Sequence, residues 1–138
     1  VFGGAITTLL DHASGIAVVP LVGPSAILLA LMASGLSGQA FAFHGYLPVP
    51  EVERAARLRE LEAESRARSY TQIFIETPYR NASMLATLAS VLSPRTRLAV
   101  AADLTLPTES VVMRAAADWR RVDPASYQKR PAIFLMQV

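Results

Sequence analysis

Cysteine is absent from the 138-residue chain, and histidine occurs only as His12 and His44. A chain without cysteine forms no disulfide, offers no thiolate ligand to a metal and has no cysteine nucleophile. Two histidines are also too few for a histidine-rich metal centre. We therefore expect no bound metal, and the missing cysteine is compatible with the reducing environment of the cytoplasm.

Charged residues are absent from residues 15–47. An uncharged stretch raises the question of a membrane span, which needs about 20 consecutive apolar residues. Pro20, Gly23 and Pro24 interrupt this stretch, and the apolar run over residues 24–34 has only about half of the required length. The sequence therefore predicts that this stretch is buried in a protein core and not in a membrane.

The net charge is small, because 13 basic residues stand against 11 acidic ones. Such a surplus is not typical of a domain whose main role is to hold nucleic acid. Both signs crowd into residues 51–68, which favours a solvent-exposed helix. The last third of the chain is basic, and its cations either lie in solvent or contact phosphate: Arg114, Arg120, Arg121, Lys129 and Arg130.

Apolar residues recur at helical or strand spacing along almost the whole chain. The resulting order predicts an α/β fold, a mixed five-stranded sheet flanked by helices and preceded by a helix-strand-helix segment. Thr77 is the predicted N-cap of one helix, with Pro78 in its first turn. The expected elements are helices over residues 4–13, 25–33, 52–68 and 78–92, strands over residues 16–19, 40–46, 72–76, 98–102, 110–114 and 133–138, and a short helix before the last strand.

A link of small residues at 35–39 separates the first part of the chain from a self-sufficient α/β unit. The strand expected over residues 16–19 has no neighbour before this link, and one strand cannot complete a parallel sheet. We therefore expect a fragment of a longer protein, in which residues 1–38 end an N-terminal domain and residues 39–138 form a C-terminal α/β domain.

Residues 18–26 read as an apolar strand that runs through a Gly-Pro turn into a helix opening with Ser25 and Ala26. A helix start of this kind directs free backbone N–H groups and a positive dipole end into a crevice, where α/β proteins commonly bind cofactors. The alternative is purely structural, because proline is also common at an ordinary helix start.

Several linked motifs resemble one family. They are the Pro20–Ala26 segment before an alanine- and leucine-rich helix, Phe-His-Gly-Tyr-Leu-Pro at 43–48, Phe-Ile-Glu-Thr-Pro-Tyr-Arg at 74–80, and Asp103-Leu104-Thr105 with Glu109. Together they resemble the S-adenosylmethionine-dependent tetrapyrrole methylase superfamily, above all its branch of ribose 2′-O-methyltransferases of small-subunit ribosomal RNA. The resemblance covers nearly the whole chain in order. It implies two α/β domains that enclose S-adenosylmethionine between them, and a cytoplasmic homodimer.

The resemblance also implies where the cofactor binds. Its contacts fall at strand ends and helix starts, which are the places where an α/β sheet exposes unpaired backbone groups to a ligand. The implied cofactor-binding residues are Gly23, Pro24, Ser25, Ala26, Glu76, Thr77, Leu104, Thr105, Pro131 and Ala132.

Methyl transfer from a sulfonium depends mainly on placing the nucleophile in line with the methyl carbon. Glu76 and Asp103 are the carboxylates nearest the implied cleft, and each is a candidate for general base, cofactor ligand or acceptor of backbone hydrogen bonds. Arg80 matches an arginine of the ribosomal branch, and it either contacts an RNA phosphate or pairs with Glu76.

Four further side chains have a structural and a functional interpretation. His44 lies in an apolar strand and is expected to be a packed, hydrogen-bonded side chain, not a general base. Phe74, Tyr79 and Trp119 are expected to pack in the core, and the alternative is that they stack on a base.

The chain departs from the ribosomal branch at two places. Ala102, Asp103 and Leu106 stand where that branch usually has Arg, Glu and a basic residue, and Arg130-Pro131 stands where it usually has Gly-Glu. The resemblance nevertheless implies a methyltransferase that acts on ribosomal RNA, present as a partial chain that is inactive alone. The alternatives are a methylase of a tetrapyrrole or other small molecule, and a non-catalytic α/β domain that serves dimerisation.

Overall fold

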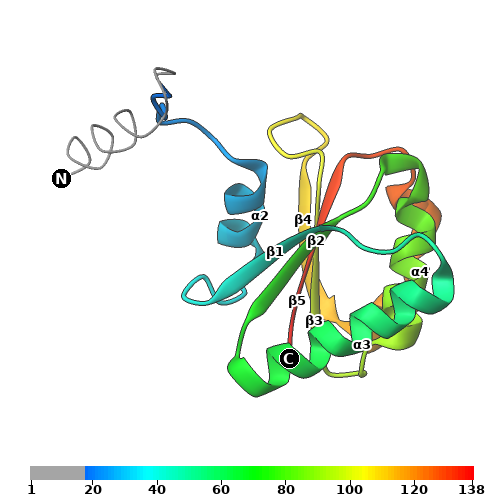
Figure 1. The fold of residues 1–138 in the computed structure, drawn as a ribbon. Coiled ribbons are helices and arrows are strands. Elements are labelled where there is room, and N and C mark those ends of the chain that lie inside the picture. The colour runs from blue at the N-terminus through cyan, green and yellow to red at the C-terminus, as the bar shows by residue number, and fades with distance from the viewer. Residues whose placement is uncertain (1–17) are drawn as a thin grey trace.

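The computed structural model describes residues 18–138 (Figure 1). Its strands are β1 (Phe41–Tyr46), β2 (Thr71–Ile75), β3 (Arg97–Ala102), β4 (Ser110–Ala115) and β5 (Ala132–Gln137). They form one sheet in the order β1-β2-β5-β3-β4. Strands β1 and β2 run parallel and the other neighbours run antiparallel, so the sheet is mixed, as the sequence predicts.

Helices cover both faces of this sheet. They are α2 (Ala26–Ser34), α3 (Glu51–Arg68), α4 (Asn81–Val91) and α5 (Ala116–Trp119), with short 3-10 turns at η1 (Pro78–Arg80) and η2 (Pro124–Tyr127). Helices α3 and α4 lie on one face, and α2 lies on the other (Figure 1). None of the helices in residues 18–138 has the length and apolar character needed to cross a membrane.

The face under α3, α4 and α5 carries the larger core. Side chains alternate along a strand, so Phe74 of β2 points to this face while Ile73 and Ile75 point to α2. The rings of Phe74 and Phe134 stack at 6.0 Å between centroids, with 10° between their planes. Both side chains are fully buried.

Two buried charged side chains tie α3 to its surroundings on this face. The Glu62 carboxylate accepts hydrogen bonds from the Ser93 backbone N–H at 2.8 Å and from the Thr96 hydroxyl at 2.6 Å. The Arg54 guanidinium donates to the hydroxyls of Ser83 and Thr87 on α4, at 3.0 and 2.9 Å. These bonds fix α3 against α4 and against the loop that leads into β3.

Most predicted elements agree with the structure within one or two residues, and one prediction is wrong. Val18 and Val19, the described half of the predicted strand 16–19, are irregular and each 54% exposed, because no strand of residues 18–138 pairs with them. Thr77 is the N-cap residue before Pro78, as predicted, although its side chain makes no capping hydrogen bond and its hydroxyl lies 3.4 Å from the Glu76 carboxylate. The predicted helix 4–13 lies outside the described residues.

Candidate functional site

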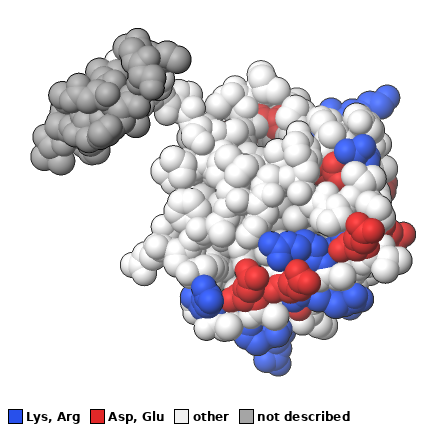
Figure 2. All heavy atoms as spheres, in the orientation of Figure 1, with Lys and Arg blue, Asp and Glu red and all other residues white. Residues whose placement is uncertain are grey.

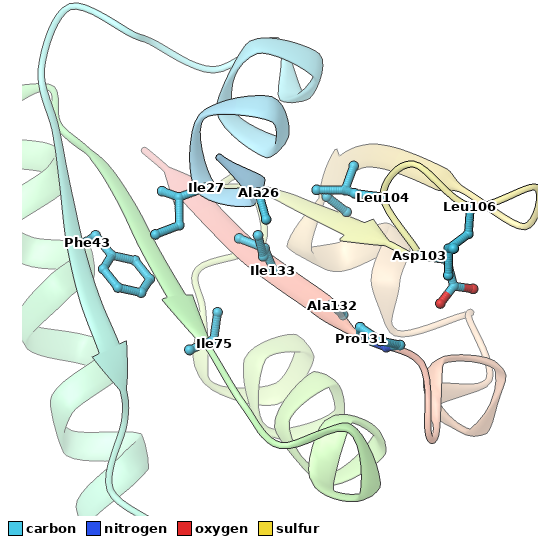
Figure 3. A pocket seen from close by; sticks show the side chains of 11 residues that line it. Ala26, Ile27, Phe43, Ile75, Asp103, Leu104, Leu106, Pro131, Ala132 and Ile133 are labelled. Atoms are coloured by element: carbon cyan, nitrogen blue, oxygen red, sulfur yellow. The ribbon is translucent and has the colours of Figure 1, made fainter. Parts of the chain in front are cut away.

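A cavity of about 420 Å³ opens where the start of α2 meets the ends of β2 and β3 (Figure 3). Its walls come from α2, β1, β2, β3, β5 and the loop that links β3 to β4. Almost all of the lining side chains are apolar, and Asp103 is the only ionisable one. The lining residues are Ala26, Ile27, Phe43, Ile75, Ala101, Asp103, Leu104, Leu106, Pro131, Ala132 and Ile133.

Helix α2 forms one rim of the cavity. It begins after Ser25, whose hydroxyl accepts a hydrogen bond from the Leu28 backbone N–H at 3.5 Å, and it ends at Gly35, whose φ of 76° suits glycine. Ala26 and Ile27 form its first turn and point into the cavity (Figure 3). The predicted helix start at residue 25 therefore lies at the ligand-sized opening.

The opposite rim is made where β3 ends and β5 begins. Ala102 pairs with Ala132 in the sheet, and the Asp103 backbone N–H continues the ladder by donating to the Pro131 carbonyl at 2.9 Å. After Asp103 the chain turns away through Leu104, whose side chain reaches the cavity. The two predicted segments around Asp103 and Pro131 are thus hydrogen-bonded neighbours.

Asp103 is held as a carboxylate. Its Oδ2 accepts hydrogen bonds from Arg130 Nε at 2.7 Å and from the Thr108 hydroxyl at 2.9 Å. The hydrogen bond from Arg130 is the main cause that lowers the pKa of Asp103 below its ordinary value, and burial offsets part of the effect. The cavity therefore carries one fixed negative charge in an apolar lining.

Glu76 lies just beyond the cavity and its side chain is nearly fully buried. Its Oε1 accepts hydrogen bonds from the Thr77 backbone N–H at 2.7 Å and from Arg80 Nε at 3.1 Å, while its Oε2 is buried without a partner. The pairing of Arg80 with Glu76 is one of the two alternatives that the sequence left open. Arg80 also stacks on the ring of Tyr79, at 5.1 Å from its centroid.

The structure gathers five of the twelve predicted site residues around the cavity. Ala26, Asp103, Leu104, Pro131 and Ala132 line it. The predicted residues that do not line it are Gly23, Pro24, Ser25, Glu76, Thr77, Arg80 and Thr105.

Sequence reasoning missed the apolar walls: Ile27, Phe43, Ile75, Ala101, Leu106 and Ile133. The signal that would have found three of them is the alternation of side chains along a strand. Ile75 and Ile133 lie next to a predicted site residue and Ala101 lies two positions before one, and all three point to the α2 face.

Of the four side chains that had a structural and a functional interpretation, three are placed as expected and one is not. Phe74 and Trp119 are buried in the core, as expected, and His44 is hydrogen-bonded through Nε2 to Gln72 Oε1 at 2.7 Å, also as expected. Tyr79 is 61% exposed, so the prediction that it packs in the core is wrong. It follows the Thr77-Pro78 turn, which directs its ring outward over Arg80. Within the described residues, no group of three histidine or acidic side chains is arranged to hold a metal ion.

Known proteins that resemble this chain are methyltransferases. The chain is 42% identical over 112 residues to "Ribosomal RNA small subunit methyltransferase I" of Mesorhizobium japonicum, covering 79% of this chain and 36% of that protein. It is 38% identical over 98 residues to the protein of the same name from Vibrio cholerae, covering 71% of this chain and 33% of that one. The chain thus spans about a third of the length of these relatives. No protein-family model matches it.

Two solved structures share the fold. The methyltransferase CobJ superposes with a TM-score of 0.58 at 20% identity, over 98% of this chain and 56% of that one. The cobalt precorrin-4 methyltransferase CbiF superposes with a TM-score of 0.58 at 17% identity, over 98% of this chain and 59% of that one.

Proposed function

The chain belongs to the S-adenosylmethionine-dependent tetrapyrrole methylase superfamily, and we propose that it is part of an enzyme that methylates a ribose 2′-hydroxyl of small-subunit ribosomal RNA. The proposal is supported by its relatives, which carry the name of a small-subunit ribosomal RNA methyltransferase at up to 42% identity. The structural observation that carries it is the apolar cavity at the edge of the sheet, to which five of the predicted site residues contribute.

We further propose how the chain fits into the whole enzyme. Residues 1–38 are the end of an N-terminal cofactor-binding domain, and residues 39–138 are the C-terminal α/β domain. Because the relatives are about three times as long as the matched segment, a second cavity wall comes from outside this chain. The enzyme acts in the cytoplasm as a homodimer.

The residues around the cavity suit S-adenosylmethionine. The apolar floor of Ile75, Ala101 and Ile133 accommodates the flat, weakly polar faces of a nucleoside. Backbone groups at Ala26 and Ala132 lie at a helix start and a strand start, where N–H and C=O groups reach a ligand. The Asp103 carboxylate accepts hydrogen bonds from hydroxyl or amino groups of the bound molecule.

The cofactor supplies the methyl group when it is bound. The residues of this chain bind and orient it and exclude water from the apolar floor, and this placement is the main contribution that such a transfer needs from a protein. A general base works best with a pKa near the working pH, whereas the pKa of Asp103 is lowered, so Asp103 is better suited to binding than to proton removal.

Glu76 and Thr77 complete the polar part of the proposed site. Glu76 Oε2 is a buried acceptor without a partner in the described residues, and its carboxylate places a second negative charge next to the cavity. Beside it, the exposed ring of Tyr79 and the partly exposed guanidinium of Arg80 offer a stacking surface and a cation to an RNA strand.

Blocking the cavity tests this function. Ala26 is exposed at the start of α2 and lines the cavity, so Ala26→Trp fills the opening without overpacking the core. In the full-length protein we expect calorimetry with S-adenosylhomocysteine to show binding that falls at least about tenfold in this variant. The control is Ala33→Trp, because Ala33 is exposed on the same helix and does not line the cavity.

The outcomes separate clearly. Transfer of a labelled methyl group to small-subunit ribosomal RNA by the wild type and the Ala33→Trp variant, and not by Ala26→Trp, supports the proposal. Absence of binding by the full-length wild type, or equal loss in both variants, contradicts it. Methylation of a tetrapyrrole in place of RNA contradicts the proposed acceptor and leaves the cofactor site standing.

A further inference from the structure

The loop between β3 and β4 forms one wall of the cavity, and its Leu104 packs against the core under α2. It supplies Asp103, Leu104 and Leu106 to the lining, and Leu106 is 51% exposed. Asp103 and Thr105 have φ values of 53° and 70°, in the left-handed region that non-glycine residues seldom occupy. Such a wall keeps its shape only if other groups hold it.

The internal hydrogen bonds of the loop hold its turns and not its position. The backbone N–H of Leu106 donates to the Asp103 carbonyl, and that of Glu109 donates to the Leu106 carbonyl, both at 2.9 Å. Thr105 N–H donates to Glu109 Oε1 at 3.0 Å. All of these bonds join one part of the loop to another, so they would survive if the loop swung away from the cavity.

Besides the backbone bond from the Asp103 N–H to the Pro131 carbonyl, the side-chain hydrogen bonds of Arg130 connect the loop to the rest of the described molecule. Arg130 Nε donates to Asp103 Oδ2 at 2.7 Å, and one terminal nitrogen donates to the Thr108 carbonyl at 2.9 Å and to the Ser110 hydroxyl at 3.2 Å. A single planar guanidinium thus contacts the beginning, the later part and the end of the segment 103–110. Its rigid fork of donors makes such simultaneous bonds with little loss of entropy.

Arg130 is itself fixed from the other side. The fully buried Asn81, at the start of α4, donates from Nδ2 to the Arg130 carbonyl. The guanidinium lies over the Tyr127 ring, at 5.4 Å from its centroid. The preceding residue Lys129, with a φ of 63°, donates its backbone N–H to the Pro78 carbonyl at 2.8 Å.

We propose that Arg130 is a positioning residue that clamps the 103–110 loop against the cavity and so sets the affinity for the cofactor. The clamp runs from Asn81 through Arg130 to the loop, and its anchor on α4 lies outside the cavity lining. This inference rests on the proposed function, because it takes the cavity to be the cofactor site. Arg130 touches no lining residue other than the carboxylate of Asp103 through its side-chain hydrogen bonds.

The test compares Arg130→Gln and Arg130→Lys with the wild type in the full-length protein. Because hydrogen bonds to charged groups are lost, we expect the KM for S-adenosylmethionine to rise about tenfold in Arg130→Gln while kcat stays within about twofold. Arg130→Lys keeps one cation beside Asp103 but not the fork, so its KM should rise only about threefold. A general loss of structure would lower the apparent kcat and leave KM unchanged.

The matched control is Arg120→Gln. Arg120 also donates through Nε to a backbone carbonyl, that of Ala89 at 2.8 Å, and it lies away from the cavity. We expect its KM to equal that of the wild type. An unchanged KM in Arg130→Gln, or an equal rise in Arg120→Gln, overturns the clamp.

A second measurement needs no cofactor. Amide hydrogen exchange at Asp103, whose N–H donates to the Pro131 carbonyl, should be faster in Arg130→Gln than in the wild type, with exchange at Leu106, in β3 and in β5 unchanged. Exchange that is equal in both proteins overturns the clamp. If the wild type fails to bind S-adenosylmethionine while exchange still accelerates, the proposed function fails and the clamp on the loop stands.

Discussion

The two faces of the sheet are covered in different ways. Three helices, α3, α4 and α5, close one face over fully buried rings such as Phe74 and Phe134. The other face carries only α2 in the described residues, and Phe43 and Met32 stay 43% and 72% exposed there. Charged side chains gather over the lower part of the molecule, where α3 lies, while the side of α2 is almost free of them (Figure 2).

The closed face therefore contributes mainly to stability, and the partly covered face contributes mainly to binding. A filled face gains free energy from burial and close packing, and it leaves no room for a ligand. A partly covered face keeps apolar surface in contact with solvent, and such patches commonly mark sites of interaction. The cavity is lined mainly from the α2 side, so changes on the closed face should mainly lower stability and changes on the α2 face should mainly lower ligand affinity.

The largest effect is expected from Phe74→Ala on the closed face. Removing a fully buried ring that stacks on Phe134 should lower the free energy of unfolding by about 3–5 kcal/mol. Urea denaturation measures this loss. A loss below about 1 kcal/mol would mean that the closed face is not the main source of stability.

The next effect concerns a polar contact of the same face. Glu62→Gln replaces an acceptor oxygen near the Ser93 N–H and the Thr96 hydroxyl, and should cost about 2 kcal/mol. Glu60→Gln on the same helix is the control, because Glu60 is exposed and pairs only with Arg57 on the surface. Its cost should stay below about 0.5 kcal/mol, and equal costs for the two variants would contradict the argument.

The same division explains how much the sequence could predict. The helix 52–68 was recognisable because its charges and apolar residues alternate at helical spacing, and it differs from α3 by one residue at its start. The strand expected over 16–19 was inferred from apolar character alone. A strand needs a hydrogen-bonding neighbour, and that requirement is not written in the segment itself.

The parts of the site at turns and strand ends could be predicted from the sequence. The apolar walls could not, because they depend on which elements pack together. Ser25 stands at a helix start that the Gly23-Pro24 turn reveals, whereas Asp103 and Pro131, at the end of β3 and before β5, were identified through the family resemblance. Phe43 reaches the cavity from β1, at the edge of the sheet, and only the order of the strands shows that β1 lies beside β2, whose Ile75 also lines the cavity. The Asp103–Arg130 pair joins residues 27 positions apart, which spacing does not reveal.

A smaller effect on stability is expected on the open face. Phe43→Ala removes a half-exposed ring and should cost less than about 1.5 kcal/mol of unfolding free energy, while it weakens binding of S-adenosylhomocysteine several-fold. Phe41→Ala is the matched control, because Phe41 is 42% exposed on the same strand and does not line the cavity. Calorimetry should show wild-type affinity in this control, and equal weakening in both variants would remove the distinction between cavity and surface.

The smallest expected effect is a dependence of the unfolding free energy on pH, which is caused by Asp103 in the cavity lining. Hydrogen bonding to Arg130 keeps the pKa of Asp103 below its unfolded value, so the folded state releases this proton more readily than the unfolded chain. The stability that this carboxylate contributes is present above the unfolded pKa and is lost as the pH falls from roughly 4 through the folded pKa.

Denaturation of wild type and Asp103→Asn over a range of pH checks this. The difference in unfolding free energy between the two proteins should be constant near neutrality and shrink below about pH 4. Arg130→Gln should weaken the same pH dependence, since it removes the donor that lowers the pKa of Asp103. A difference between wild type and Asp103→Asn that stays constant down to pH 3 would show that the carboxylate gains nothing from Arg130, because protonation of an unpaired group affects the folded and unfolded chains alike.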